Sequence, residues 1–128
     1  MGKVLKIRIG DEAGAFELFE DKAPHSCKAL LDNLPVKSNA IIAKVAGLEL
    51  MIRAPYFVDT GGENETTAQK PGNVCYVPGS QNICIFCEDL PGLGPCSLIG
   101  KVTENLEGIQ AEARKCKSKQ GAYVEIYE

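Results

Sequence analysis

The sequence predicts a mainly β domain, an antiparallel barrel or sandwich with two helices as caps. Two observations predict this fold class. Short apolar runs of β type recur along the chain and are separated by turns that contain glycine, proline or asparagine. Helical periodicity is confined to two segments, residues 24–34 and 105–116. Many short strands with two isolated helices are typical of antiparallel barrels and sandwiches.

Each predicted strand is a run rich in β-branched or aromatic residues that ends at a turn signal. The first two runs flank GDEAG, and the next two flank Ala46-Gly47, where glycine suits a tight turn, so each pair is expected to form a hairpin. The predicted strands are VLKIRI (4–9), AFELF (15–19), AIIAKV (40–45), LELMIRA (48–54), VCYV (74–77), ICIFC (83–87), SLIGKV (97–102) and AYVEIY (122–127).

The two helices are predicted from their ends and their apolar faces. Pro24 suits a first helical turn and Pro35 stops the first helix, while Asn105 is the expected N-cap of the second. The apolar faces comprise Ala23, Cys27, Leu30, Leu31 and Leu34 in the first helix, and Leu106, Ile109, Ala113 and Cys116 in the second. Between the strands, residues 59–73 form a polar loop long enough to be functional or mobile.

Composition restricts the function classes. A chain of 128 residues is expected to fold as a single domain over residues 1–128. With 45% hydrophobic residues, 24% charged residues and a formal charge of -3, neither disorder nor nucleic-acid binding is indicated. No run approaches the ~18 apolar residues of a membrane span, and MGKVLKIRIG lacks the apolar core of a signal peptide. We therefore expect a cytoplasmic protein that binds no membrane.

The six cysteines include a C-x-x-C pair, Cys84 and Cys87, at a spacing shared by zinc and redox sites. Within a strand, the side chains of residues three apart point to opposite faces of the sheet. These two thiols are therefore not expected to coordinate one metal ion. Free cysteine in an apolar strand behaves as a small hydrophobic residue. A spatial cluster with Cys75 or Cys96 remains open, because neighbouring strands could align them. We expect reduced thiols, no cofactor and no metal.

Other polar residues also have plain interpretations. Glu63 and Glu65 could serve acid–base or metal chemistry, but a solvated charge run in a loop is the favoured interpretation. His25, the single histidine, lies in the first turn of the first helix and is expected to be a solvated surface residue. A nucleophilic cysteine would need a base beside it, and this position does not indicate one.

Four segments, in order along the chain, resemble cyclophilins. They are FELFEDKAPHSCKALLDNL (16–34), RAPYFVDTGGE (53–63), PGSQNICIF (78–86) and LIGKVTENLEGI (98–109). PGNVCYVPG, CIFC and SLIGKV are similar to the compact cyclophilin-like proteins of bacteria and archaea. The resemblance implies a closed, eight-stranded antiparallel barrel capped by two helices.

The resemblance also implies site residues. Arg53 would be the catalytic arginine, Phe57 part of the proline pocket and Gln81 a group that binds the peptide backbone. Ile83 replaces a pocket phenylalanine, and Pro91 and Cys96 stand where the family has tryptophan and histidine. The remaining residues expected to line the site are Met51 and Tyr76.

This chain departs from the family pattern around Arg53. Only Ala54 separates Arg53 from Pro55, Thr60 replaces a glutamine, and the chain has no tryptophan. The pocket is therefore expected to be shallower or differently shaped. By the alternation of strand residues, Arg53 is equally well interpreted as a solvent-facing charge opposite a core-facing Ile52.

Prolyl isomerisation needs little chemistry from a protein. The barrier of about 18–20 kcal/mol comes from amide resonance, and a cation that donates to the prolyl nitrogen would weaken that resonance. The sequence thus predicts a domain that binds a peptide or small molecule in an apolar cleft, with weak or absent prolyl isomerase activity. The alternative is a thiol-rich metal-binding or redox protein.

Overall fold

The computed structural model describes residues 2–42, 48–90, 95–119 and 121–128. The bounds of the elements are β1 (Val4–Ile9), β2 (Glu12–Leu18), α1 (Pro24–Asp32), β3 (Val36–Ile42), β4 (Glu49–Arg53), β5 (Glu65–Thr66), β6 (Asn73–Val77), β7 (Asn82–Phe86), β8 (Cys96–Glu104), α2 (Leu106–Lys119) and β9 (Ala122–Tyr127).

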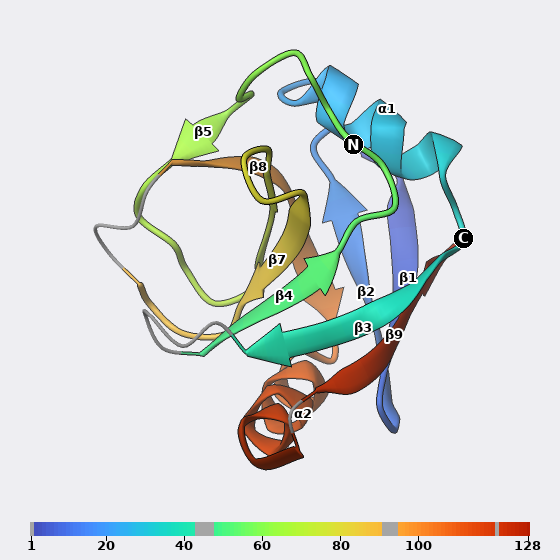
Figure 1. The fold of residues 1–128 in the computed structure, drawn as a ribbon, viewed down its shortest axis with the longest axis vertical. Coiled ribbons are helices and arrows are strands. Elements are labelled where there is room, and N and C mark those ends of the chain that lie inside the picture. Colours follow the sequence, from blue (N-terminus) through green and yellow to red (C-terminus); the bar gives the residue numbers. More distant parts are fainter. Residues whose placement is uncertain (1, 43–47, 91–94, 120) are drawn as a thin grey trace.

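Eight strands form a closed antiparallel barrel, which confirms the predicted fold class. Neighbouring strands follow the order β2-β1-β9-β3-β4-β7-β6-β8, and β2 pairs with β8 to close the sheet. The two-residue strand β5 pairs with the start of β8 outside this ring. In Figure 1, α1 lies near one end of the barrel and α2 near the other.

The predicted strands and helices all occur. Strands β1 and β9 have the predicted bounds, and the ends of the other elements are shifted. Strand β3 begins at Val36 rather than at residue 40, because β9 supplies pairing partners for residues 36–40. Strand β5 lies inside the segment 59–73, which was predicted to be a loop throughout. The predicted turn at Ala46-Gly47 and the site residue Pro91 lie outside the described residues.

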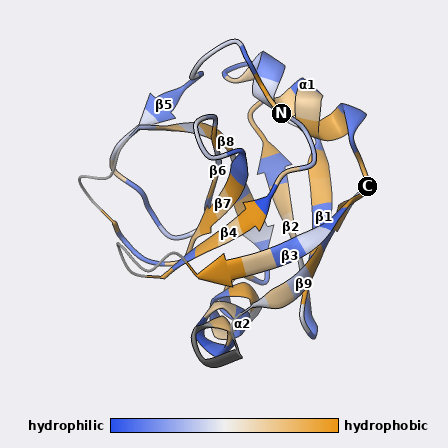
Figure 2. Ribbon diagram, in the orientation of Figure 1, coloured by the Kyte–Doolittle hydropathy of each residue, from blue (hydrophilic) through white to orange (hydrophobic). Residues whose placement is uncertain are grey.

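The barrel interior is the main hydrophobic core. Strand β1 shows why: Leu5, Ile7 and Ile9 are fully buried while the residues between them are exposed, as alternation across a pleated strand requires. Ile109 and Ala113 of α2 and Cys27 of α1 join the same core from the barrel ends. In Figure 2, β4 and β1 are mostly hydrophobic, β3 changes between hydrophobic and hydrophilic residues along its length, and much of the connecting loops is hydrophilic.

A second, smaller apolar cluster lies on the outer face of β6, β7 and β8. Its buried members are Cys75, Cys84, Phe86, Leu90 and Cys96, with Met51, Val77 and Leu98 packed against them. An isolated bridge between Gln69 and Leu90 brings two loop segments over this face. Part of the barrel exterior is thus covered by the chain itself.

The second helix begins as predicted. The side-chain oxygen of Asn105 accepts a hydrogen bond from the backbone N–H of Gly108 at 3.1 Å, which satisfies one of the free donors of the first turn. Asn105 has a φ of 60°, in the left-handed region that asparagine tolerates better than most residues. Neither helix in the described ranges is long and apolar enough to cross a membrane.

Candidate functional site

Arg53 ends strand β4 and points away from the barrel core. Its strand neighbours Ile52 and Leu50 are buried inside the barrel, whereas Arg53 is exposed and Met51 packs in the outer cluster. Its partner across the sheet is Asn82 of β7. Arg53 is therefore a solvent-facing cation on the outer face, and no carboxylate in the described part of the chain forms an ion pair with it.

The other predicted site residues do not form one pocket. Ile83 and Tyr76 are fully buried in the barrel core, on the opposite side of the sheet from Met51 and Cys96. Each of these strands alternates its side chains between the two faces. Residues that the family resemblance groups together are thus separated here by the thickness of the sheet.

Gln81 connects two parts of the site through its backbone and its side chain. Its carbonyl oxygen accepts from the Ala54 N–H at 3.1 Å, and its side-chain amide donates to the Ala54 carbonyl at 2.9 Å. Gln81 has a φ of 57° and ends the turn between β6 and β7. It therefore holds the turn at 78–81 against the residue that follows Arg53.

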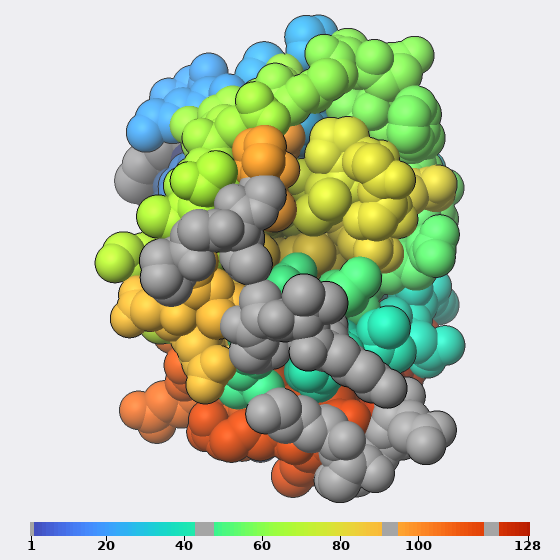
Figure 3. Space-filling model, turned by 60° about the vertical axis from the view of Figure 1, so that its left-hand side comes forward, coloured from blue at the N-terminus to red at the C-terminus, as the bar shows by residue number. Residues whose placement is uncertain are grey.

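A shallow, open groove of about 450 Å³ lies next to this junction. Its lining residues are Phe57, Val58, Asp59, Gly61, Pro78 and Gly79. One wall is the segment that follows β4 and the other is the turn between β6 and β7. Figure 3 shows these segments in green and yellow on the same face of the molecule. Phe57 is the most exposed large hydrophobic residue in the described ranges, with 62% of its surface accessible.

Two stacked tyrosines support the first wall. The rings of Tyr56 and Tyr76 lie 5.7 Å apart at an interplanar angle of 14°. The Tyr76 hydroxyl accepts a hydrogen bond from the Val58 N–H at 3.1 Å. Burial raises the pKa of the Tyr56 phenol, and its hydroxyl has no hydrogen-bond partner in the described structure. Tyr76 thus positions the groove wall from inside the barrel.

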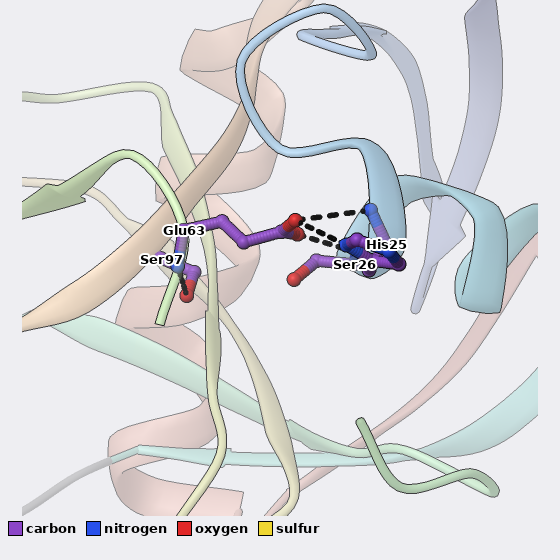
Figure 4. A network of polar contacts seen from close by, with 4 residues as sticks. All are labelled: His25, Ser26, Glu63 and Ser97. Carbon is purple, nitrogen blue, oxygen red and sulfur yellow. Dashed lines mark hydrogen bonds and ion pairs between the residues drawn. The ribbon is translucent and has the colours of Figure 1, made fainter. Parts of the chain in front are cut away.

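Glu63 forms a polar network that joins the same segment to α1 (Figure 4). Its carboxylate accepts from the backbone N–H groups of His25 and Ser26, at 3.2 and 2.8 Å, and lies 2.8 Å from the His25 Nδ1. Its own N–H donates to the Ser97 hydroxyl of β8 at 3.0 Å. Burial alone would raise the pKa of the Glu63 carboxyl. The hydrogen bonds from Ser26 and His25 outweigh burial, so the pKa is lowered from its ordinary value.

The prediction of a solvated charge at Glu63 is therefore wrong, because only 13% of its side chain is exposed. Glu65 is exposed, as predicted. His25 is a surface residue as expected, but it pairs with Glu63 instead of facing only water. The sequence did contain a signal for this contact. Ala23, at the N-cap position, has no side-chain acceptor, so the backbone N–H groups of the first helical turn need an acceptor from another part of the chain.

The two cysteines of the C-x-x-C pair point to opposite faces of the sheet, as predicted. Cys84 packs in the outer cluster and Cys87 in the barrel core. The cluster that the sequence left open does exist, because Cys75, Cys84 and Cys96 share the outer face. Among the residues that the structure describes, no group of three His, Cys, Asp or Glu side chains is arranged to hold a metal ion.

All six cysteines are buried, and none forms a disulfide. Burial disfavours the charged thiolate form of a cysteine. It raises the pKa of Cys27 and of Cys87 to about 12. It also raises the pKa values of Cys75, Cys84 and Cys96. Because the thiolate is the reactive form, these cysteines are poorly suited to nucleophilic or redox chemistry.

Solved structures of other proteins share this fold. A structure of McbB in complex with tryptophan is 19% identical with a TM-score of 0.83, and the match covers 97% of this chain but only 44% of McbB. The chain therefore spans less than half the length of McbB. The solution structure of the hypothetical protein AF2241 from Archaeoglobus fulgidus is 26% identical with a TM-score of 0.71, and the match covers 98% of this chain and 94% of AF2241.

Sequence comparison with curated proteins gives no significant match. The profile of one family, described as protein of unknown function (DUF3830), matches residues 5–127. This range includes every strand from β2 to β9, both helices and all the residues of the groove. The chain therefore belongs to the DUF3830 family.

Proposed function

We propose that this protein is a cyclophilin-like binding domain that holds a peptide or small ligand in the groove beside Phe57, with Arg53 at the groove's edge. The observation that carries the proposal is the 62% exposure of Phe57, which lies in the wall of an open groove. An exposed aromatic side chain next to a depression is typical of binding surfaces.

The charge beside this groove supports a ligand with a carbonyl or carboxylate group. Two hydrogen bonds of Gln81 hold the groove turn against Ala54, which is the residue that follows Arg53. An arginine guanidinium presents several N–H donors in a fixed plane, which suits planar carbonyl and carboxylate groups. An apolar ligand group would lie against Phe57 while Arg53 orients its polar end.

The cyclophilin-like assignment rests on the closed eight-stranded barrel with two helices and on the order of the resembling segments. Prolyl isomerase activity would be weak under this proposal. Ile83 and Tyr76 face the barrel core and add no wall to a proline slot on the outside. Specificity for proline requires an apolar enclosure as well as a cation.

The probes for a binding test are a tetrapeptide with one Ala-Pro bond and L-tryptophan, which is the molecule bound to McbB. Each is titrated into 15N-labelled protein while amide chemical shifts are followed. We expect shifts that saturate at Phe57, Val58, Gly61 and Gly79, and none in α2. The absence of saturable shifts with both probes, or shifts spread evenly over the barrel, would contradict the proposal.

The role of Arg53 is tested with a matched pair of variants. Arg53→Ala should weaken binding of the peptide and lower any isomerisation rate in a protease-coupled assay. Arg8→Ala, which removes an exposed arginine from β1 on another part of the barrel, should change neither. A preorganised hydrogen-bond donor contributes about a hundredfold or more to kcat in other enzymes. An unchanged isomerisation rate in Arg53→Ala would mean that Arg53 is a surface charge with no part in catalysis.

The thiol-rich alternative keeps one supporting observation, the gathering of Cys75, Cys84 and Cys96 on the outer face. A soft metal ion would favour such a set of thiolates. Their burial and raised pKa values oppose it, because each ligand would have to lose its proton. Elemental analysis of the purified protein tests the metal-binding form of this alternative, which requires a stoichiometric metal ion.

A further inference from the structure

Helix α1 begins without a cap of its own. The residue at its N-cap position is Ala23, whose side chain carries no hydrogen-bond acceptor. Pro24 follows and has no N–H, so the first free backbone donors are those of His25 and Ser26. A helix start of this kind needs an acceptor from another part of the chain.

Glu63 supplies this acceptor from 37 and 38 residues away. Its two carboxylate oxygens accept from Ser26 and His25, and the negative charge suits the positive end of the helix dipole. The cap is nearly enclosed, since 13% of the Glu63 side chain is exposed. This arrangement differs from the usual local cap because it fixes a distant loop as well as the helix.

The loop that Glu63 fixes is the groove wall. At one end of the wall, the Val58 N–H is bound to the Tyr76 hydroxyl of β6. At the other end, Glu63 is bound to α1 through its carboxylate and to Ser97 of β8 through its N–H. Between these two anchors the chain turns at Gly61, whose φ of 83° suits only glycine without strain.

We propose that Glu63 is a positioning residue of the binding groove, and that it couples the first turn of α1 to the wall formed by residues 57–61. This inference rests on the groove of the proposed function. Loss of the Glu63 cap would leave this end of the wall held only by the Glu63 N–H on Ser97, so the spacing between Phe57 and the turn at 78–79 would be fixed less firmly. Coupling between two sites is reciprocal, so a ligand in the groove would in turn stabilise the start of α1.

The competing interpretation is that Glu63 only caps the helix. The two interpretations differ at Val58, which lies five residues away at the opposite anchor and does not contact Glu63. A cap alone would protect the amides of His25 and Ser26 against hydrogen exchange. A cap that also positions the wall would protect the Val58 amide against exchange as well. If the wall moved away from Tyr76, the Val58 N–H would lose its acceptor, the Tyr76 hydroxyl.

The experiment compares Glu63→Gln with Glu65→Gln by hydrogen exchange of the free proteins. Glutamine keeps an acceptor oxygen but loses the charge, so the barrel should remain folded, with unchanged protection of Ile7 in β1. In Glu63→Gln we expect about tenfold faster exchange at His25, Ser26 and Val58, the factor typical of losing one cap. Glu65→Gln, at an exposed position two residues further, should alter none of them. Faster exchange at His25 and Ser26 with an unchanged Val58 would overturn the coupling.

A second measurement connects the coupling to ligand binding. With the Ala-Pro tetrapeptide as probe, Glu63→Gln should bind several-fold more weakly than the wild type, and Glu63→Asp should recover part of the loss. Peptide binding to the wild type should slow exchange at Ser26. If the wild type binds neither the peptide nor tryptophan, the proposed function fails. The Val58 exchange rate still decides whether Glu63 holds the wall.

Discussion

Cys75 of β6 lies directly opposite Cys84 of β7, and both side chains face the outer cluster of the barrel. Their neighbour Cys87, three residues after Cys84, packs on the other side of the sheet. The C-x-x-C motif is thus split by the sheet, while two cysteines distant in the sequence are brought together by strand pairing. Because Cys84 and Cys87 lie on opposite faces, substitution of Cys84 should affect the stability of the fold and not the binding of a metal ion.

We predict that Cys84→Ala lowers the free energy of unfolding by roughly 1 kcal/mol and removes no metal. The side chain is 1% exposed, so alanine leaves a small cavity in the outer cluster. Urea denaturation of the two proteins measures the difference. One equivalent of zinc in the wild type, released when the thiols are alkylated, would instead support the thiol-rich alternative.

We also predict that the thiols of the native protein react slowly. Burial raises the pKa values of Cys27 and Cys87 to about 12, so almost no thiolate is present at pH 8. Ellman's reagent should label all six cysteines in denaturant and few in the native state at that pH. Rapid labelling of one native thiol would identify a reactive site that burial does not predict.

Acid should destabilise the protein through Glu63. Its pKa is lowered from the ordinary value of 4.5 in the folded state, because the hydrogen bonds from Ser26 and His25 outweigh its burial. The charged cap therefore stabilises the fold above pH 4.5, and this contribution is lost as the pH falls through the lowered pKa. Thermal denaturation between pH 7 and 3 should show a shallower decline for Glu63→Gln than for the wild type. Parallel curves would contradict the assignment.

Asn105 offers a test of the second helix. Asn105→Ala removes the acceptor for Gly108 and puts alanine at a φ of 60°, a conformation that alanine tolerates less well than asparagine, so we expect a loss of roughly 1–2 kcal/mol. Asn105→Gly keeps the backbone relaxed and should cost less than Asn105→Ala. Equal losses in the two variants would mean that the side-chain hydrogen bonds of Asn105, to Gly108, Glu12 and Ala13, carry its effect and that its backbone conformation does not.

The sequence predicted the elements of this fold because each carries a local signal. Alternation in β1, the proline at the start of α1 and the asparagine cap of α2 are all readable within a few residues. The opposite orientation of Cys84 and Cys87 also followed from strand geometry alone. The ring closure of β2 on β8 was implied by the cyclophilin resemblance rather than by any local pattern.

The site was less predictable, because its contacts join residues that are far apart in the sequence. The role of Glu63 depends on a helix start 37 residues earlier, and an acidic residue in a polar loop gives no sign of such a partner. Tyr76 and Ile83 were expected at a pocket, but the register of β6 and β7 turns both toward the core. Strand register follows from the whole sheet and not from a motif.

The pairing of β2 with β8 has a further consequence for behaviour at high concentration. Open sheets end in strands whose unpaired N–H and C=O groups recruit other chains, and this is a common route to aggregation. Here the ring of eight strands has no such end, and β5, the edge strand outside it, is two residues long. A template of that length offers almost no backbone for a second molecule to extend. The closed sheet therefore protects strands as apolar as β7 from fibril-like growth for as long as the barrel stays folded.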